Sequence, residues 1–127
     1  MRALLPLLAA ALALPAACAT PPADPLAAVT ALIGDAACDD SSQCRTVAIG
    51  AKACGGPDAF LAWSTRRTDA KALEAAVAAY GLARVQDLPP GRRVSNCLFV
   101  ADPGAACVPA GNGRTCVLQR AGSHPAQ

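Results

Sequence analysis

The cysteines constrain this chain more than any other feature, because they are numerous while aromatic residues are few. The 127 residues include seven cysteines and four aromatic side chains. A small domain with so few large apolar side chains has a thin hydrophobic core, and such domains often depend on covalent cross-links. Disulfides persist mainly in oxidising compartments. The composition therefore predicts one small, disulfide-stapled domain outside the cytoplasm.

The first 17 residues have the organisation of an export signal. Arg2 supplies a positive charge, and Ala3 to Leu14 form an apolar run that is broken only by Pro6. The run is shorter than the roughly 20 residues that a membrane-spanning helix needs. We therefore interpret residues 1–17 as a signal peptide that is removed.

The residue after this signal is a cysteine, which indicates a lipid anchor. Residues 14–18 (Leu-Pro-Ala-Ala-Cys) resemble a bacterial lipobox, in which the cysteine becomes the first mature residue and carries lipid. Pro15 stands where that pattern usually has Leu, and ordinary cleavage after Ala17 or Ala19 is the alternative. Setting Cys18 aside leaves six cysteines, an even number that can pair completely. We predict that Cys18 is lipidated and attaches the protein to a membrane.

The residues next to Cys18 predict where the anchored domain lies. Ala19 after the cysteine, in place of Asp, is typical of lipoproteins that reach the outer membrane. Residues 18–24 include Pro21 and Pro22, which favour an extended spacer. We expect a domain tethered to the outer membrane and facing the periplasm. A soluble periplasmic or secreted protein is the alternative.

The stretch from Cys44 to Ser64 predicts a hairpin. Two apolar runs, Val47 to Ile49 and Phe60 to Trp63, flank the sequence Cys54-Gly55-Gly56-Pro57. Glycine reaches positive φ without strain, and proline holds φ at about −65°, so this sequence is a strong turn signal. We predict a strand, a braced turn and a second strand.

The same residues resemble a family of small cysteine-rich bacterial envelope proteins, many of which look like lipoproteins. The shared pattern is Gln43-Cys44, then Gly50-x-Lys52-x-Cys54-Gly55-Gly56-Pro57, then Phe60-Leu61-x-Trp63-Ser64. The resemblance extends from Cys38 to Cys116 in cysteine order, but its specific part is residues 43–64. It implies an exported, disulfide-bonded domain and carries over no catalytic residue.

Two helices are predicted around this hairpin. Residues 25–33 have apolar side chains at helical spacing, with Asp24 as N-cap and Pro25 at the first position. Residues 65–87 form the longer candidate, with Thr68 as N-cap and Gly81 as a place where it ends or bends. Its apolar stripe consists of Ala70, Leu73, Val77 and Tyr80.

The C-terminal part is predicted to form strands over residues 94–101, 106–109 and 114–120, with a hairpin turn at 110–113. The fold class is α+β: a small antiparallel sheet with one main helix and a short N-terminal helix. This single disulfide-rich domain covers residues 25–120, and residues 121–127 form a disordered tail.

Hairpin geometry predicts which cysteines pair. With Gly111-Asn112 at the centre of the turn, Cys107 lies directly opposite Cys116, at a distance that suits a disulfide. An Asn112-Gly113 turn would instead place Leu118 opposite Cys107. We predict the disulfides Cys107–Cys116, Cys38–Cys44 and Cys54–Cys97, the last two among three possible connectivities.

Most enzymatic chemistry is excluded by missing residues. The single histidine is His124 in the tail, which argues against His-dependent nucleophiles, and the single glutamate is Glu74, so paired-carboxylate chemistry would have to use aspartates that no evident scaffold brings together. The cysteine spacings contain no CxxC, which argues against zinc and against a thioredoxin-like activity. The polar loop between Cys38 and Cys44 lacks EF-hand spacing and predicts a capped turn. We expect no enzyme, metal or cofactor.

Two functions remain open. The first is a non-enzymatic, lipid-anchored envelope protein that binds or scaffolds a protein or glycan partner. Its candidate binding loop contains Lys52, Gly55, Gly56 and Pro57. The alternative is a secreted periplasmic protease inhibitor that presents residues 52–58 as a disulfide-braced loop, with Lys52 in the protease pocket. Nucleic acid is not an expected partner, because the net charge is only +2.

The lipid anchor can be tested by substitution. We expect Cys18→Ser to move the protein from the detergent phase to the aqueous phase after cell fractionation, because the substitution removes the acyl chains. Mass spectrometry of the wild-type N-terminus should find a lipidated Cys18. A Cys18→Ser protein that still partitions with membranes, or a mature N-terminus at Thr20, would contradict the prediction.

Overall fold

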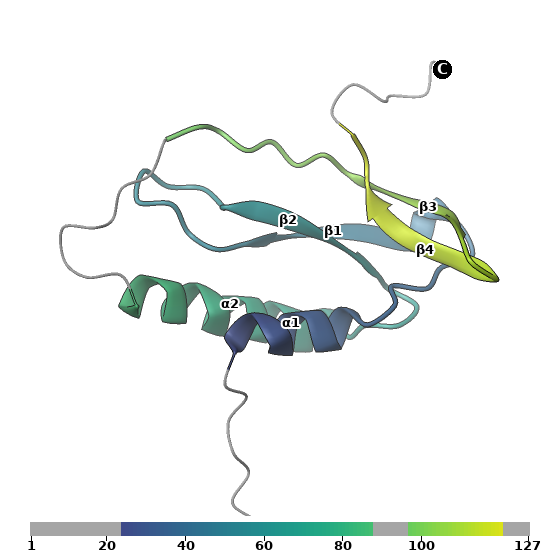
Figure 1. The fold of residues 1–127 in the computed structure, drawn as a ribbon, viewed down its shortest axis with the longest axis horizontal. Helices are drawn as coiled ribbons and strands as arrows, with labels where there is room; N and C mark the ends of the chain where they lie inside the picture. The colour runs from purple at the N-terminus through teal and green to yellow at the C-terminus, as the bar shows by residue number, and fades with distance from the viewer. Residues whose placement is uncertain (1–23, 88–96, 121–127) are drawn as a thin grey trace, which may run out of the picture.

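The computed structural model describes residues 24–87 and 97–120 and shows a disulfide-stapled α+β fold (Figure 1). Its elements in chain order are α1 (Pro25–Ile33), a 3-10 turn η1 (Ser41–Gln43), β1 (Cys44–Ile49), β2 (Ala59–Ser64), α2 (Ala70–Gln86), β3 (Ala105–Ala110) and β4 (Gly113–Leu118). The predicted fold class is confirmed, and its strands form two antiparallel hairpins, β1–β2 and β3–β4.

Several sequence predictions fall outside these ranges. They are the signal peptide at 1–17, Cys18 and most of its tether, the start of the expected strand at 94–96, and the tail at 121–127. Within the described ranges, the structure contains no helix that is long and apolar enough to span a membrane.

Helix α1 has the predicted limits. The Asp24 carboxylate accepts a hydrogen bond from the Leu26 amide at 2.9 Å, and Pro25 occupies the first turn, where its missing N–H costs nothing. Val29 and Ile33, one turn apart, are its buried residues. The helix ends at Gly34, whose φ of 58° is accessible to glycine without strain.

Helix α2 begins one residue later than predicted. Asp69, not Thr68, is the N-cap, and its carboxylate accepts from the Ala72 amide at 2.8 Å. Thr68 is buried, and its hydroxyl donates to the Leu32 carbonyl at 3.0 Å, which ties the two helices together. The helix continues through Gly81 to Gln86, so the predicted end or bend at that residue is wrong; a glycine inside a helix costs only about 1 kcal/mol relative to alanine.

The two strands of the β1–β2 hairpin are longer than the apolar runs that predicted them. Val47 pairs with Leu61, and Ile49 pairs with Ala59 beside the turn. At Gly50, with φ of 75°, a Cβ atom would lie 2.1 Å from the Asp58 carboxylate, so the turn requires glycine there. Both helices cover one face of this hairpin, and residues 97–104 run along the other (Figure 1).

The β3–β4 hairpin has the predicted register. Ala110 pairs with Gly113, and Cys107 lies opposite Cys116. The turn is therefore centred on Gly111-Asn112, and Gly111 has a positive φ of 55°. A bridge between Ala37 and Thr115 attaches the segment after α1 to the free edge of β4.

The disulfide pairing differs from the prediction in two of three bonds. The structure has Cys38–Cys107, Cys44–Cys116 and Cys54–Cys97. The predicted Cys107–Cys116 and Cys38–Cys44 are wrong, whereas Cys54–Cys97 is confirmed.

The error has a geometric cause, because opposed residues of a hairpin project from the same face of the sheet. Residues 36–38 hydrogen-bond along the free edge of β4, and the start of β1 lies against the same hairpin. Cys107 and Cys116 therefore each bond outward to a different segment, at Cα separations of 6.1 Å and 5.4 Å.

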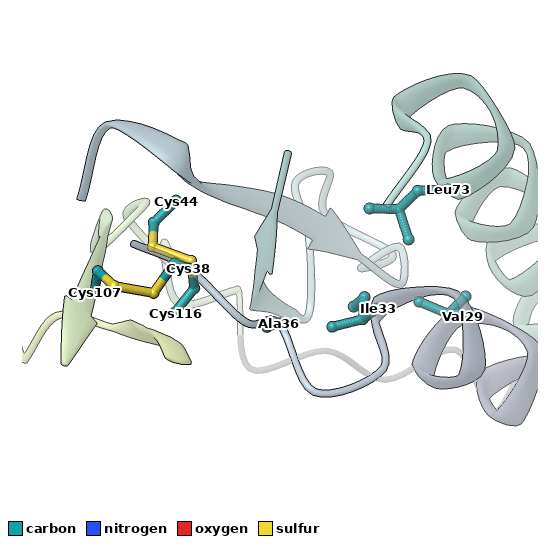
Figure 2. Packing of buried hydrophobic residues seen from close by; sticks show 8 residues of the cluster. All are labelled: Val29, Ile33, Ala36, Cys38, Cys44, Leu73, Cys107 and Cys116. Carbon is teal, nitrogen blue, oxygen red and sulfur yellow. A yellow bond between two sulfur atoms is a disulfide. The ribbon is translucent and has the colours of Figure 1, made fainter. Parts of the chain in front are cut away.

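Sulfur takes the place of aromatic rings in the core. The cluster of buried hydrophobic residues consists of Val29, Ile33, Ala36, Cys38, Cys44, Leu73, Cys107 and Cys116 (Figure 2). Four of these eight residues are cysteines. Trp63 and Tyr80 pack against the cluster but are only partly buried. The two central disulfides therefore fill the interior and also close loops that span most of the domain.

Removal of either central disulfide should strongly destabilise the fold. For the Cys38→Ser/Cys107→Ser variant we expect a loss of about 2–5 kcal/mol in the free energy of unfolding, because a large loop is released and hydroxyls enter the core. Urea unfolding followed by circular dichroism measures this loss. The Cys54→Ser/Cys97→Ser variant also releases a large loop but places its hydroxyls at an exposed site, so it separates the loop contribution from the cost of polar groups in the core. An unfolding midpoint unchanged from wild type in the first variant would contradict the prediction.

Candidate binding surface

The predicted binding loop is closed by its own backbone. The Lys52 amide donates to the Gly56 carbonyl at 3.0 Å, and the Gly55 amide donates to the Lys52 carbonyl at 3.0 Å. At the base of the loop, the Asp58 amide donates to the Ile49 carbonyl at 2.9 Å. Residues 50–58 therefore form a turn that is closed by backbone hydrogen bonds.

Two cross-links attach this loop to a distant part of the chain. The Cys54–Cys97 disulfide joins its tip to residue 97, and the Lys52 ammonium donates to the Leu98 carbonyl. Gly55 and Gly56 are exposed, while Lys52 and Pro57 are half-buried. The structure thus brings the four predicted loop residues together, and it directs the Lys52 side chain toward the protein itself.

The segment held by these cross-links is not the strand predicted for residues 94–101. Residues 97–101 have no strand structure. Cys97 has φ of 51°, a left-handed conformation that a strand cannot contain. The disulfide and the lysine contact therefore fix this segment in an irregular path along the β1–β2 hairpin.

The main consequence is an exposed aromatic ring. The exposed fraction of Phe99 is 90%, and that of its neighbour Leu98 is 65%. The sequence predicts a strand over residues 94–101, and the apolar run Leu98-Phe99-Val100 within it gives no local sign of exposure. The exposure of Phe99 follows from the disulfide between Cys97 and the loop and from the backbone conformation of Cys97, which the local sequence does not indicate.

A carboxylate holds the other end of the same segment. Asp102 accepts a hydrogen bond from the Thr46 hydroxyl at 2.6 Å and one from the Gly104 amide at 2.9 Å. The Thr46 bond, followed by the Gly104 bond, lowers the pKa of the Asp102 carboxyl below its ordinary value, because both donors favour the charged form. Phe99 therefore lies between two attachment points. We name residues 97–102 the braced segment, which Lys52, Cys54 and Thr46 hold in place.

A second feature is a polar cleft between the segment after α1 and the turn end of the β3–β4 hairpin. It has a volume of about 540 Å³ and is lined in part by Asp35, Asp39, Arg66 and Arg114. Arg66 pairs with Asp39 at 2.9 Å, and the Arg114 guanidinium donates to the Cys107 carbonyl at 2.9 Å. These cations already have partners within the chain, so the cleft offers no concentrated charge to a ligand.

The central sulfur atoms do not form a metal site in the oxidised protein. The Sγ atoms of Cys38, Cys44 and Cys107 lie within 4.8 Å of one another. All three belong to disulfides, and metals bind the thiolate form of cysteine. The nearby polar loop is a capped turn, as predicted: Asp40 accepts from the Ser42 amide at 2.7 Å.

Comparisons with known proteins give no match: no family model, no curated protein and no solved structure is similar to this chain. The candidate surface therefore depends on the geometry of the chain alone.

The Asp102 contacts should be pH-dependent. Because the folded pKa is lowered, their contribution is complete above the unfolded value of about 3.9 and is lost as pH falls through the folded value. The Gly104 amide proton should report this loss as a chemical-shift change below that pH in an NMR titration. Asp102→Asn retains an acceptor but should abolish the titration. A Gly104 shift centred above pH 3.9 would refute the assignment.

Proposed function

We propose that this protein is a non-enzymatic, lipid-anchored module of the bacterial envelope, which binds a protein partner through Leu98 and Phe99. The observation that carries this proposal is the 90% exposure of a phenylalanine on a segment fixed at both ends. An exposed apolar ring next to an exposed leucine offers apolar area to a partner, and a side chain on a backbone that is already held in place loses less entropy on binding.

The surroundings of Phe99 favour a protein partner over a glycan. Aromatic side chains anchor protein interfaces by entering apolar pockets of the partner, and Leu98 extends the apolar area. Among residues 97–102, Asp102 has the only carboxylate, and it accepts a hydrogen bond from the Thr46 hydroxyl. Sugar recognition needs several free polar groups around the ring, and this segment uses its polar groups internally.

The arrangement of the layers is compatible with tethering. The described chain begins at Asp24, on the helical side of the β1–β2 hairpin, whereas residues 97–104 lie on the opposite side (Figure 1). A tether that enters beside α1 would leave residues 97–104 on the side of the domain away from the membrane. Lipidation of Cys18 remains part of this proposal.

The protease-inhibitor alternative has less support. An inhibitory lysine must be free to enter the specificity pocket of the protease, but the Lys52 ammonium is bonded to the Leu98 carbonyl. No other observation on residues 52–58 favours that function.

Substitution of Phe99 tests the proposed surface. A photocrosslinking amino acid at position 99, incorporated in cells, should give a discrete protein adduct, and purification of that adduct identifies the partner. Phe99→Ala should then weaken binding by about thirtyfold, which corresponds to the roughly 2 kcal/mol of an interface hot spot. The free energy of unfolding should change by less than about 0.5 kcal/mol, because the ring is exposed.

Leu82 provides a matched control. Its exposed fraction is 65%, equal to that of Leu98, but it lies on α2 in the helical layer. A crosslinker at position 82 should give no such adduct, and Leu82→Ala should bind as wild type does. Equal adducts at the two positions, or unchanged binding by Phe99→Ala, would overturn the proposal.

A further inference from the structure

The three disulfides fall into two classes of accessibility. The four cysteines of Cys38–Cys107 and Cys44–Cys116 have exposed fractions between 4% and 6% and belong to the core cluster. Cys54 and Cys97 are both exposed. A thiolate must approach a sulfur atom along the axis of the S–S bond, so it can reach only an exposed disulfide without unfolding the domain.

The surroundings of the exposed bond also favour attack. Gly55 and Gly56 follow Cys54, and ideal Cβ atoms at both glycines would meet no atom within 4 Å. Neither glycine position is crowded, and Cys54 itself is exposed. Cys97, at the other end of the bond, has φ of 51°, which is unfavourable for a residue with a side chain. Breaking the bond frees this residue to leave that conformation.

We propose that Cys54–Cys97 is a thiol–disulfide exchange site, which an external dithiol reduces while the two buried disulfides remain intact. One thiolate of the dithiol attacks Sγ of Cys54, and the S–S bond breaks with Cys97 leaving as a thiolate. The second thiol of the reagent, as thiolate, then attacks the mixed disulfide and releases Cys54. Two electrons pass to the protein, the dithiol becomes a disulfide, and the two cysteines take up the two protons.

This exchange changes how the braced segment is held, not the core. Reduction removes the covalent link between the loop and residue 97, but it leaves the Asp102 contacts with Thr46 and Gly104 in place. The central disulfides still join β3–β4 to β1 and to residue 38. The inference is independent of the proposed binding function, since it concerns the reactivity of the bond and requires no partner at Phe99.

Limited reduction tests the proposal. The full chain with Cys18→Ser, oxidised and folded, is treated with limiting dithiothreitol and quenched at intervals with iodoacetamide. Peptide mass spectrometry then gives the alkylated fraction of each cysteine. Cys54 and Cys97 should be modified together, at least about tenfold faster than the other four, because the buried bonds react only after opening of the domain. The circular dichroism spectrum should be retained through this fast phase.

A double variant completes the test. Cys54→Ala/Cys97→Ala should fold, keep the helical signal and lack the fast phase, while its remaining cysteines react at the slow wild-type rate. Three results would overturn the proposal: faster labelling of a buried pair, simultaneous labelling of all six cysteines, or an unfolded double variant, which would make the bond a requirement of the fold.

Discussion

The packing of two disulfides against each other at the centre of the domain is the constraint on which the rest of the structure depends. Cys38–Cys107 and Cys44–Cys116 connect the segment after α1 and the start of β1 to the two strands of the C-terminal hairpin. The remaining fully buried large side chains are few, with Leu73 and Val29 the main ones. A core of this size would not order two separate hairpins by apolar burial alone. The covalent links set their relative position, and the helices then cover the remaining apolar face.

The stabilising role of the two core disulfides explains why Phe99 can be exposed at the surface. The core disulfides secure the domain, so the braced segment is not needed to bury apolar area. Its cross-links to Lys52, Cys54 and Thr46 use polar and covalent contacts, which fix the path of the backbone without covering Phe99. The partner-binding function that we propose depends on this separation between a stabilising core and an exposed segment.

Local signals in the sequence predicted the elements well. Asp24-Pro25, the Cys54-Gly55-Gly56-Pro57 turn and Gly111-Asn112 each specify their own backbone, so α1, the first hairpin and the register of the second follow from a few residues. Most inferences that needed the arrangement of elements in space failed, and the Cys54–Cys97 disulfide is the exception. The register of Cys107 and Cys116 was correct, but their partners depend on which segments pack on that face. The apolar run around Phe99 predicted a buried strand, because nothing local reveals the conformation of Cys97.

The order of the cysteines along the chain has a consequence for biogenesis. Leaving Cys18 aside, the first and second cysteines bond to the fifth and sixth, across separations of 69 and 72 residues. A chain appears N-terminus first, so Cys38 and Cys44 become available long before Cys107 and Cys116 exist as partners. An oxidant acting at that stage would join Cys38 to Cys44 across a short turn. Efficient maturation therefore calls for a cellular machinery that can undo early bonds, such as a disulfide isomerase, in addition to one that forms them.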